Sequence, residues 1–178
     1  EDDKRKDLLF AGTELGVFIS WNGGKDWSSF QLNLPITPIT DLRVHQDDLI
    51  AATSGRSFWV LDDLGLVRQY KNSEPSFELF QPEPAMLVNG YSELDGSSAD
   101  FDGTNPYRGV NPATGLVIYY QLPELKTSEN VVLEIKDAQG NLVRTFSSLR
   151  DSTRKQYDGA PPADPTLSKS KGLNRFVW

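Results

Sequence analysis

Leu9-Phe10-Ala11-Gly12-Thr13 recurs in similar form as Leu49-Ile50-Ala51-Ala52-Thr53, at an offset of 40 residues (49 − 9 = 40). The apolar runs that follow, Val17-Phe18-Ile19 and Phe58-Trp59-Val60, are separated by almost the same interval (58 − 17 = 41). A repeat of about 40 residues made of short β-rich runs has the size of one β-propeller blade. The repeat therefore predicts an all-β fold with such blades at the start of the chain, and a generic β-sandwich is the alternative.

Short apolar runs separated by Gly, Asn, Asp and Pro are predicted to be the strands of this region. They are Leu8–Thr13, Val17–Trp21, Trp27–Leu32, Thr40–His45, Leu49–Thr53, Ser57–Leu61 and Val67–Tyr70. They are apolar on both faces, which is typical of strands lying between neighbouring blades. Residues 40–70 would then form a four-stranded blade, and residues 8–32 a blade whose innermost strand is expected to precede Glu1.

A turn motif supports the propeller interpretation. The stretch Ser20-Trp21-Asn22-Gly23-Gly24-Lys25-Asp26-Trp27 resembles the Asp-box, Ser-x-Asp-x-Gly-x-x-Trp, with Asn22 in the Asp position. The Ser and Asn side chains can accept hydrogen bonds from backbone amides, and the two glycines can adopt positive φ. Trp27 is expected to fold back over the turn and bury its ring. We interpret Ser20, Asn22, Gly24 and Trp27 as a structural staple, with sugar binding by a motif tryptophan as the alternative.

Longer stretches carry a family resemblance. They are Leu8–Ser20, Asn33–Pro35, Thr40–Leu42, Gly55–Asp63, Asn111–Tyr120 and Gly172–Trp178. Together they resemble the bacterial sortilin-like proteins, which are often named BNR-repeat glycosyl hydrolases. The resemblance implies a large secreted or periplasmic protein whose last propeller blades precede an Ig-like domain. The family name implies glycoside hydrolysis, but analogy at the level of the fold does not establish chemistry.

Three regions are predicted along the chain. Residues 1–72 are expected to be terminal propeller blades, 73–110 an irregular linker rich in Pro and Gly, and 111–178 an incomplete Ig-like β-sandwich. Asp100–Asn105 in the linker is similar to the start of a calcium loop, but Asn111 occupies the twelfth position, where an EF-hand needs an acidic ligand. We therefore interpret this segment as an acidic loop, and no metal site is predicted.

The last region shows a half-buried β pattern. Leu116, Ile118, Tyr120 and Leu122 would share one strand face, and Val131, Leu133 and Ile135 alternate with polar residues. A turn at Asp137–Asn141 leads into a returning strand, as in Ig-like domains of the FlgD type. Residues 147–171 are expected to form an exposed loop before a last strand at 173–178. The closing strands expected of the sandwich are absent from the sequence, which would leave an open β edge.

Composition excludes several classes of protein and site. The chain has 178 residues, 18 Lys+Arg against 25 Asp+Glu, a net charge of −7, no cysteine and one histidine. Excess acid disfavours nucleic-acid binding, and no apolar run reaches the roughly 20 residues of a membrane span. The absence of cysteine excludes disulfides and thiolate sites, and one histidine leaves little material for a zinc site or a Ser-His-Asp triad. No cofactor is expected.

Candidate site residues remain few. Glu14 and Asp41 lie near predicted strand ends and are weak candidates for catalytic carboxylates, because glycosidases need two. Arg43, Arg56 and Trp59 are weak candidates for ligand binding. The single histidine, His45, is expected to be packed or hydrogen-bonded on a blade strand.

The sequence thus favours a non-catalytic fragment of a large secreted or periplasmic protein that acts as a structural and protein- or glycan-binding scaffold. The alternative is part of a glycoside hydrolase whose active site lies mainly in blades outside this chain. The expected partners are the remaining blades of the parent chain, a peptide or carbohydrate ligand, and further copies that associate through open β edges. We also expect the isolated chain to expose apolar blade surface.

Overall fold

The computed structural model describes residues 1–62, 64–71, 74–85, 115–150 and 164–178. Within these ranges the regular secondary structure is almost entirely β, as predicted, with small antiparallel sheets and one short helix, α1 (Gly65–Gln69). The chain divides into two compact units. Unit 1 comprises Glu1–Ser73 and Gln81–Leu116, and unit 2 comprises Glu74–Phe80 and Val117–Trp178.

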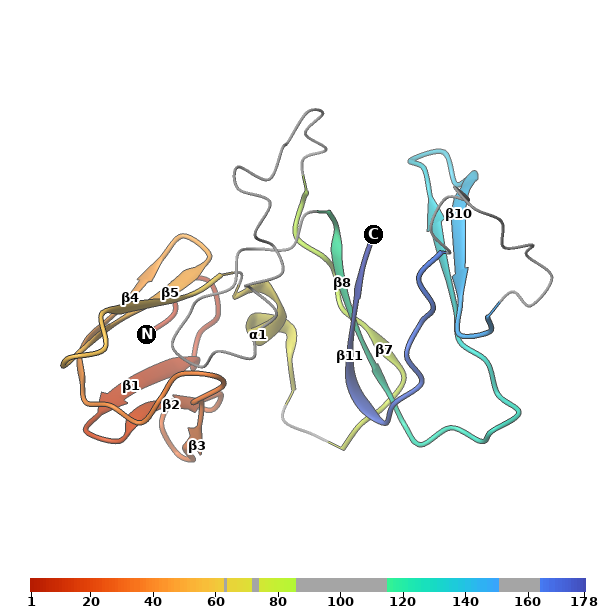
Figure 1. Ribbon diagram of the computed structural model, residues 1–178. Coiled ribbons are helices and arrows are strands. Elements are labelled where there is room, and N and C mark those ends of the chain that lie inside the picture. The colour runs from red at the N-terminus through yellow and green to blue at the C-terminus, as the bar shows by residue number, and fades with distance from the viewer. Residues whose placement is uncertain (63, 72–73, 86–114, 151–163) are drawn as a thin grey trace, which may run out of the picture. The chain divides into compact units, whose positions relative to one another are not determined.

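Unit 1 contains two three-stranded meanders. Sheet 1 has the order β1 (Leu9–Thr13), β2 (Gly16–Ser20), β3 (Ser28–Ser29), and sheet 2 has the order β4 (Ile39–His45), β5 (Asp48–Thr53), β6 (Phe58–Leu61). Strand β1 packs against β4, so that sheet 2 lies over sheet 1 (Figure 1). The two copies of the sequence repeat are therefore two sheets stacked face to face.

The core of unit 1 fills the space between these sheets. Its buried members are Val17, Leu49 and Leu64. Partly buried apolar side chains complete it: Phe10, Phe30, Leu34, Ile39, Leu42, Val44, Leu61 and Val67. Alternation along each strand brings these residues to the facing sides, because successive side chains of a strand point to opposite faces.

Gly12 on β1 packs closely against β4. A Cβ atom at this position would lie 2.6 Å from Ile39 Cγ2 and 3.3 Å from Leu42 Cδ1. The second copy of the repeat has Ala52 at the matching position. Glycine at the first position is therefore explained by packing against β4.

Gly12→Ala is expected to lower the free energy of unfolding by about 2 kcal/mol, since the new methyl group overlaps Ile39. Urea denaturation followed by tryptophan fluorescence measures the change. Combining it with Ile39→Ala, which removes the overlapped Cγ2, should cost less than the sum of the two single changes. An unchanged stability in Gly12→Ala would show that the sheets are further apart.

The predicted strand at Val67–Tyr70 is wrong, because this segment is part of helix α1 and its C-cap. The Arg68 amide donates to the Leu64 carbonyl oxygen at 2.8 Å, and the Tyr70 amide donates to Leu66 at 2.8 Å. Leu64 is fully buried, and Val67, one turn later, packs against the same core. Residues three positions apart lie on the same side of a helix, so one helical turn brings both side chains to the core. A strand would not. Residues 40–70 thus form three strands and a helix.

Strands β5 and β6 are apolar on both faces, as predicted, but β4 is not. Along β4, Leu42 and Val44 contact the core, while Asp41 and Arg43 are exposed. His45 continues the exposed row, so its expected packing is also wrong. The reason is the period of two: His45 falls on the same face as Asp41 and Arg43.

A charge cluster fastens the N-terminal segment to helix α1. Arg68 Nη2 lies 2.7 Å from Asp2 Oδ1, and the Asp2 side chain is inaccessible to solvent. Asp2 Oδ2 also accepts hydrogen bonds from the amides of Lys4 (3.1 Å) and Arg5 (2.6 Å). Arg68 pairs with Asp47 as well. Arg5 Nη1 donates to three carbonyl oxygens at the end of the helix, those of Val67, Arg68 and Tyr70.

This cluster should make unit 1 sensitive to acid. Burial raises the pKa of Asp2, but the hydrogen bonds from Arg68, Arg5 and Lys4 outweigh it and hold the pKa below 3.8. Because the folded-state pKa is the lower one, the stabilisation is complete above about pH 4 and is lost as the pH falls through the folded value. Hydrogen bonds from Lys4 and then Arg68 lower the pKa of Asp47 in the same direction.

We expect the melting temperature of unit 1 to fall steeply below about pH 4, and to fall less in Asp2→Asn. Thermal melts between pH 2 and pH 7, followed by circular dichroism, check this. Equal losses in the wild type and in Asp2→Asn would exclude Asp2 as the cause.

Unit 2 contains the other two sheets. Sheet 3 has the order β11 (Gly172–Val177), β8 (Val117–Leu122), β7 (Glu78–Leu79), and sheet 4 pairs β10 (Leu142–Ser147) with β9 (Val132–Lys136). Ile118, Tyr120 and Leu122 share one buried face, as predicted. The ring of Phe146 lies 4.7 Å from that of Phe176, so sheets 3 and 4 contact through aromatic side chains.

The β9–β10 hairpin closes through the predicted turn. Asp137 Oδ1 accepts hydrogen bonds from the amides of Gln139 (2.9 Å) and Asn141 (2.8 Å), and Gly140 has a φ of 87°. Hydrogen bonds from Asn141 lower the pKa of Asp137. The local sequence Asp-x-x-Gly-Asn therefore fixes the hairpin, as Asx turns do.

Two predicted connections contain ordered contacts. The linker predicted at 73–110 includes β7, and Phe80 beside it is buried, with its amide donating to Tyr119 at 3.0 Å. In the loop predicted at 147–171, Leu167 is buried rather than exposed, and its amide donates to Ser147 at 3.1 Å. Residues 86–114, with the Asp100–Asn105 segment, and residues 151–163 lie outside the described residues.

Candidate functional site

The turn after β2 is organised by one buried hydroxyl group. Ser20 is fully buried, and its Oγ accepts a hydrogen bond from the Gly24 amide at 2.9 Å. The same Oγ donates to Asn22 Oδ1 at 3.0 Å, and Asn22 Oδ1 also accepts from the Asp26 amide at 3.0 Å. Gly23 and Gly24 have φ values of 70° and 85°, which favour glycine. The side-chain-to-backbone hydrogen bonds expected of the motif are present.

Trp27 also contacts this turn. Its Nε1 donates to the Gly24 carbonyl oxygen at 3.1 Å, so the indole folds back over the turn as expected. The side chain is 43% exposed, however, and the expected burial of the ring is wrong. Trp27 precedes β3, a strand of only two residues at the edge of sheet 1, so little of the sheet is there to cover it.

Asparagine in the Asp position has a local explanation. Asn22 Nδ2 donates to Asp26 Oδ2 at 2.7 Å, a hydrogen bond that an ionised aspartate could not donate. An aspartate at position 22 would place its carboxylate against that of Asp26. Asn22 and Asp26 therefore form a matched pair within the turn.

Asn22→Asp is expected to destabilise unit 1 by about 1 kcal/mol at neutral pH, through the lost hydrogen bond and the repulsion of two carboxylates. The loss should shrink below about pH 4, where one carboxyl group is protonated. Urea denaturation at pH 7 and pH 3.5 measures both values. The double variant Asn22→Asp/Asp26→Asn exchanges the two groups and should recover most of the stability, and failure to recover would contradict the pairing.

The two carboxylate candidates belong to different elements. Glu14 is exposed in the turn between β1 and β2, in sheet 1. Asp41 is exposed on β4, in sheet 2, where its Oδ1 accepts from the Leu42 amide at 2.9 Å. A glycosidase requires a pair of carboxylates that flanks one glycosidic bond.

The binding candidates are also divided between locations. Arg43 lines a hollow of about 200 Å³ together with Glu1, Asp3, Phe10, Leu42, Val44 and Leu49. Trp59 lines a smaller, mainly apolar groove of about 60 Å³ beside Leu32 and Val60. Trp59 Nε1 donates to the Arg56 carbonyl oxygen at 2.9 Å, so Arg56 supports the indole through its backbone. Both hollows are smaller than the roughly 300 Å³ at which small-molecule pockets begin.

The described residues contain no group of three or more His, Cys, Asp or Glu side chains placed to hold a metal ion. No helix in the described part of the chain is long and apolar enough to cross a membrane.

The geometry of unit 1 thus separates its candidates into two kinds. Ser20, Asn22, Gly24 and Trp27 form one hydrogen-bonded turn, whereas Glu14, Asp41, Arg43 and Trp59 are dispersed over two sheets. Comparison with family models, with curated proteins and with solved structures finds no match to this chain.

Proposed function

We propose that this chain is a non-catalytic part of a large secreted or periplasmic propeller protein of the sortilin-like, BNR-repeat type. In that protein it serves as a structural scaffold that binds a protein or glycan ligand. The observation that carries the proposal is the turn of Ser20, Asn22, Gly24 and Trp27, whose side-chain-to-backbone hydrogen bonds support an Asp-box-like motif. The motif closes the first of two stacked sheets that repeat at 40 residues (49 − 9 = 40).

Unit 1 corresponds in this proposal to terminal propeller blades. Stacked sheets that follow one another along the chain are the building plan of a propeller, whose blades have a period of about 40 to 45 residues. Among the described residues sheet 2 has three strands, and helix α1 follows β6 in the chain, where a fourth strand was predicted. The remaining blades of the parent chain would be partners of unit 1.

Unit 2 corresponds to an incomplete Ig-like sandwich. Its two antiparallel sheets contact through Phe146 and Phe176, and the β9–β10 hairpin closes with the Asp137–Asn141 turn. Val132, Leu142 and Val143 are exposed on the two-stranded sheet 4. Exposed apolar strands of this kind are covered in complete sandwiches by further strands or by partners.

The positions of the acids support a non-catalytic role. Glycoside hydrolysis needs an acid and a second carboxylate on opposite sides of one glycosidic bond. Glu14 and Asp41 are exposed in different sheets, and neither is among the residues that line the two hollows. A scaffold needs surface and rigidity instead, which the stacked sheets supply.

Calorimetric titration of residues 1–178, and of the longer parent, with panels of peptides and oligosaccharides tests the proposal. Saturable binding is expected for one panel. Trp27→Ala should lower the melting temperature and leave the affinity unchanged, because Trp27 acts on the turn. Loss of glycan affinity in a folded Trp27→Ala variant would instead make this tryptophan a ligand contact, and no saturable binding by either protein would contradict the scaffold role.

A further inference from the structure

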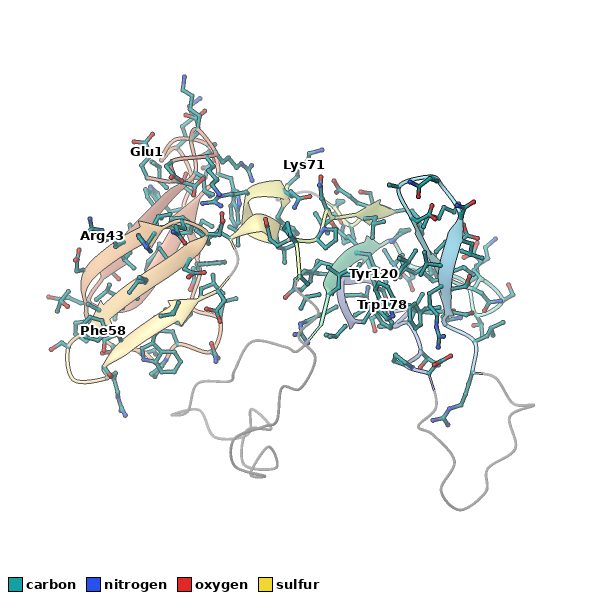
Figure 2. The ribbon with its side chains drawn as sticks, turned by 90° about the horizontal axis from the view of Figure 1, so that it is seen from above. Glu1, Arg43, Phe58, Lys71, Tyr120 and Trp178 are labelled. Carbon is teal, nitrogen blue, oxygen red and sulfur yellow. The ribbon has the colours of Figure 1, made fainter. Side chains whose placement is uncertain are left out.

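The outer face of sheet 2, the side turned away from sheet 1, carries an exposed apolar stripe. Phe58 and Val60 on β6 are 74% and 52% exposed. Their register partners on β5 are Ala52 and Ile50, respectively, both half-buried. Figure 2 shows Phe58 at the start of β6 and Arg43 on the neighbouring part of sheet 2. Large apolar groups exposed together on a sheet mark a surface that another molecule covers.

Two opposite charges border this stripe on β4. Asp41 pairs in register with Ala52, and Arg43 pairs with Ile50, so each charge extends one of the two apolar rows. Arg43 has no ion pair with another described residue, and Asp41 accepts only the amide of Leu42. The outer face therefore has two rows of side chains that run across the strands. One row contains Asp41, Ala52 and Phe58, and the other contains Arg43, Ile50 and Val60. The rows have opposite charge and similar apolar character.

These two rows are complementary to each other, so the face is complementary to itself. We propose that, where no further blade covers it, the outer face of sheet 2 binds the same face of a second copy of this chain. The two-fold axis would lie in the interface and cross the strands at the level of Leu42, Ala51 and Trp59, midway between the two rows. Asp41 of each copy then faces Arg43 of the other, as a self-complementary interface requires.

The same axis matches the apolar side chains by size. Phe58 faces Val60 of the second copy, and Ala52 faces Ile50, so a large group meets a smaller one at each contact. A two-fold axis parallel to the strands would instead place Asp41 against Phe58 of the second copy and leave Arg43 against Val60. That arrangement buries charges without partners, which is unfavourable. Charge and size thus select the arrangement with antiparallel strands.

Sedimentation velocity over a concentration series of residues 1–178 measures the dimer dissociation constant. Either single change, Asp41→Arg or Arg43→Asp, would place like charges opposite each other at both of the two symmetry-related contacts. Each should therefore raise this constant at least about tenfold. The double variant Asp41→Arg/Arg43→Asp exchanges the charges and should return within about threefold of the wild type. Phe58→Ser should abolish dimerisation.

Leu15→Ser is the matched control, since Leu15 is 67% exposed in the β1–β2 turn, outside the outer face of sheet 2. It should leave the dissociation constant unchanged, and thermal melts confirm that every variant is folded. A monomeric wild type would overturn the proposal and leave this face to another segment of a longer parent. A dimer that tolerates either single reversal, or that the double variant does not restore, would overturn the proposed geometry.

Discussion

Replacing Arg68 with Met is expected to lower the free energy of unfolding of unit 1 by about 3 kcal/mol. Arg68 Nη2 and Nε lie 2.7 and 3.0 Å from Asp2 Oδ1, and the Asp2 side chain has no contact with solvent. Removal of the guanidinium leaves a buried carboxylate whose opposite charge is gone. Urea denaturation at pH 7, followed by tryptophan fluorescence, gives the value.

Two control variants distinguish the effect of the buried Asp2–Arg68 pair from that of an exposed ion pair. The double variant Asp2→Asn/Arg68→Met removes both charges and should be more stable than Arg68→Met alone, because no unpaired charge is buried. Lys4→Ala removes an exposed ion pair with Asp47 and should cost less than about 1 kcal/mol. Equal stability of Arg68→Met and Lys4→Ala would contradict the role of the buried pair.

Leu64→Ala is expected to have a similar effect, about 2 to 5 kcal/mol, because Leu64 is fully buried in the core between sheet 1, sheet 2 and helix α1. The same denaturation experiment measures it. Leu15→Ala, at an exposed apolar position, is the control and should change stability by less than about 0.5 kcal/mol. A small loss in Leu64→Ala would mean that helix α1 does not close this core.

The strands were predictable where the apolar pattern is long and regular. The repeat that contains β1, β2, β5 and β6 and the alternation along β8 and β9 place those strands within a residue or two of their positions. Helix α1 was not predictable in this way. Its apolar run is too short to distinguish the period of a helix from that of a strand. Contacts with residues distant in sequence decide which of the two it forms.

The buried pair of Asp2 and Arg68 shows the same limit. The two residues are 66 positions apart, and neither has a local sequence pattern that indicates a partner. Among many charged residues, only the fold determines which two become neighbours. The exposure of Trp27 and His45 likewise depends on which sheet face remains uncovered.

The candidate site residues also differ in whether local sequence or the whole fold determines their contacts. The hydrogen bonds of the Asp-box-like turn join residues within the span Ser20–Trp27, so the local sequence was sufficient to predict them. Glu14, Asp41, Arg43 and Trp59 were proposed from residue type and strand position. Their faces and neighbours depend on how the two sheets stack, which no local motif specifies.

A scaffold without catalysis releases no reducing sugar, so the decisive experiment is an assay of reducing sugar released from a panel of polysaccharides. It is measured for residues 1–178, for the longer parent, and for parent variants with Glu14→Gln or Asp41→Asn. We predict no release above the buffer rate for any of these proteins. Release by the parent that is lost in either variant would contradict the claim and make this chain part of a glycosidase active site.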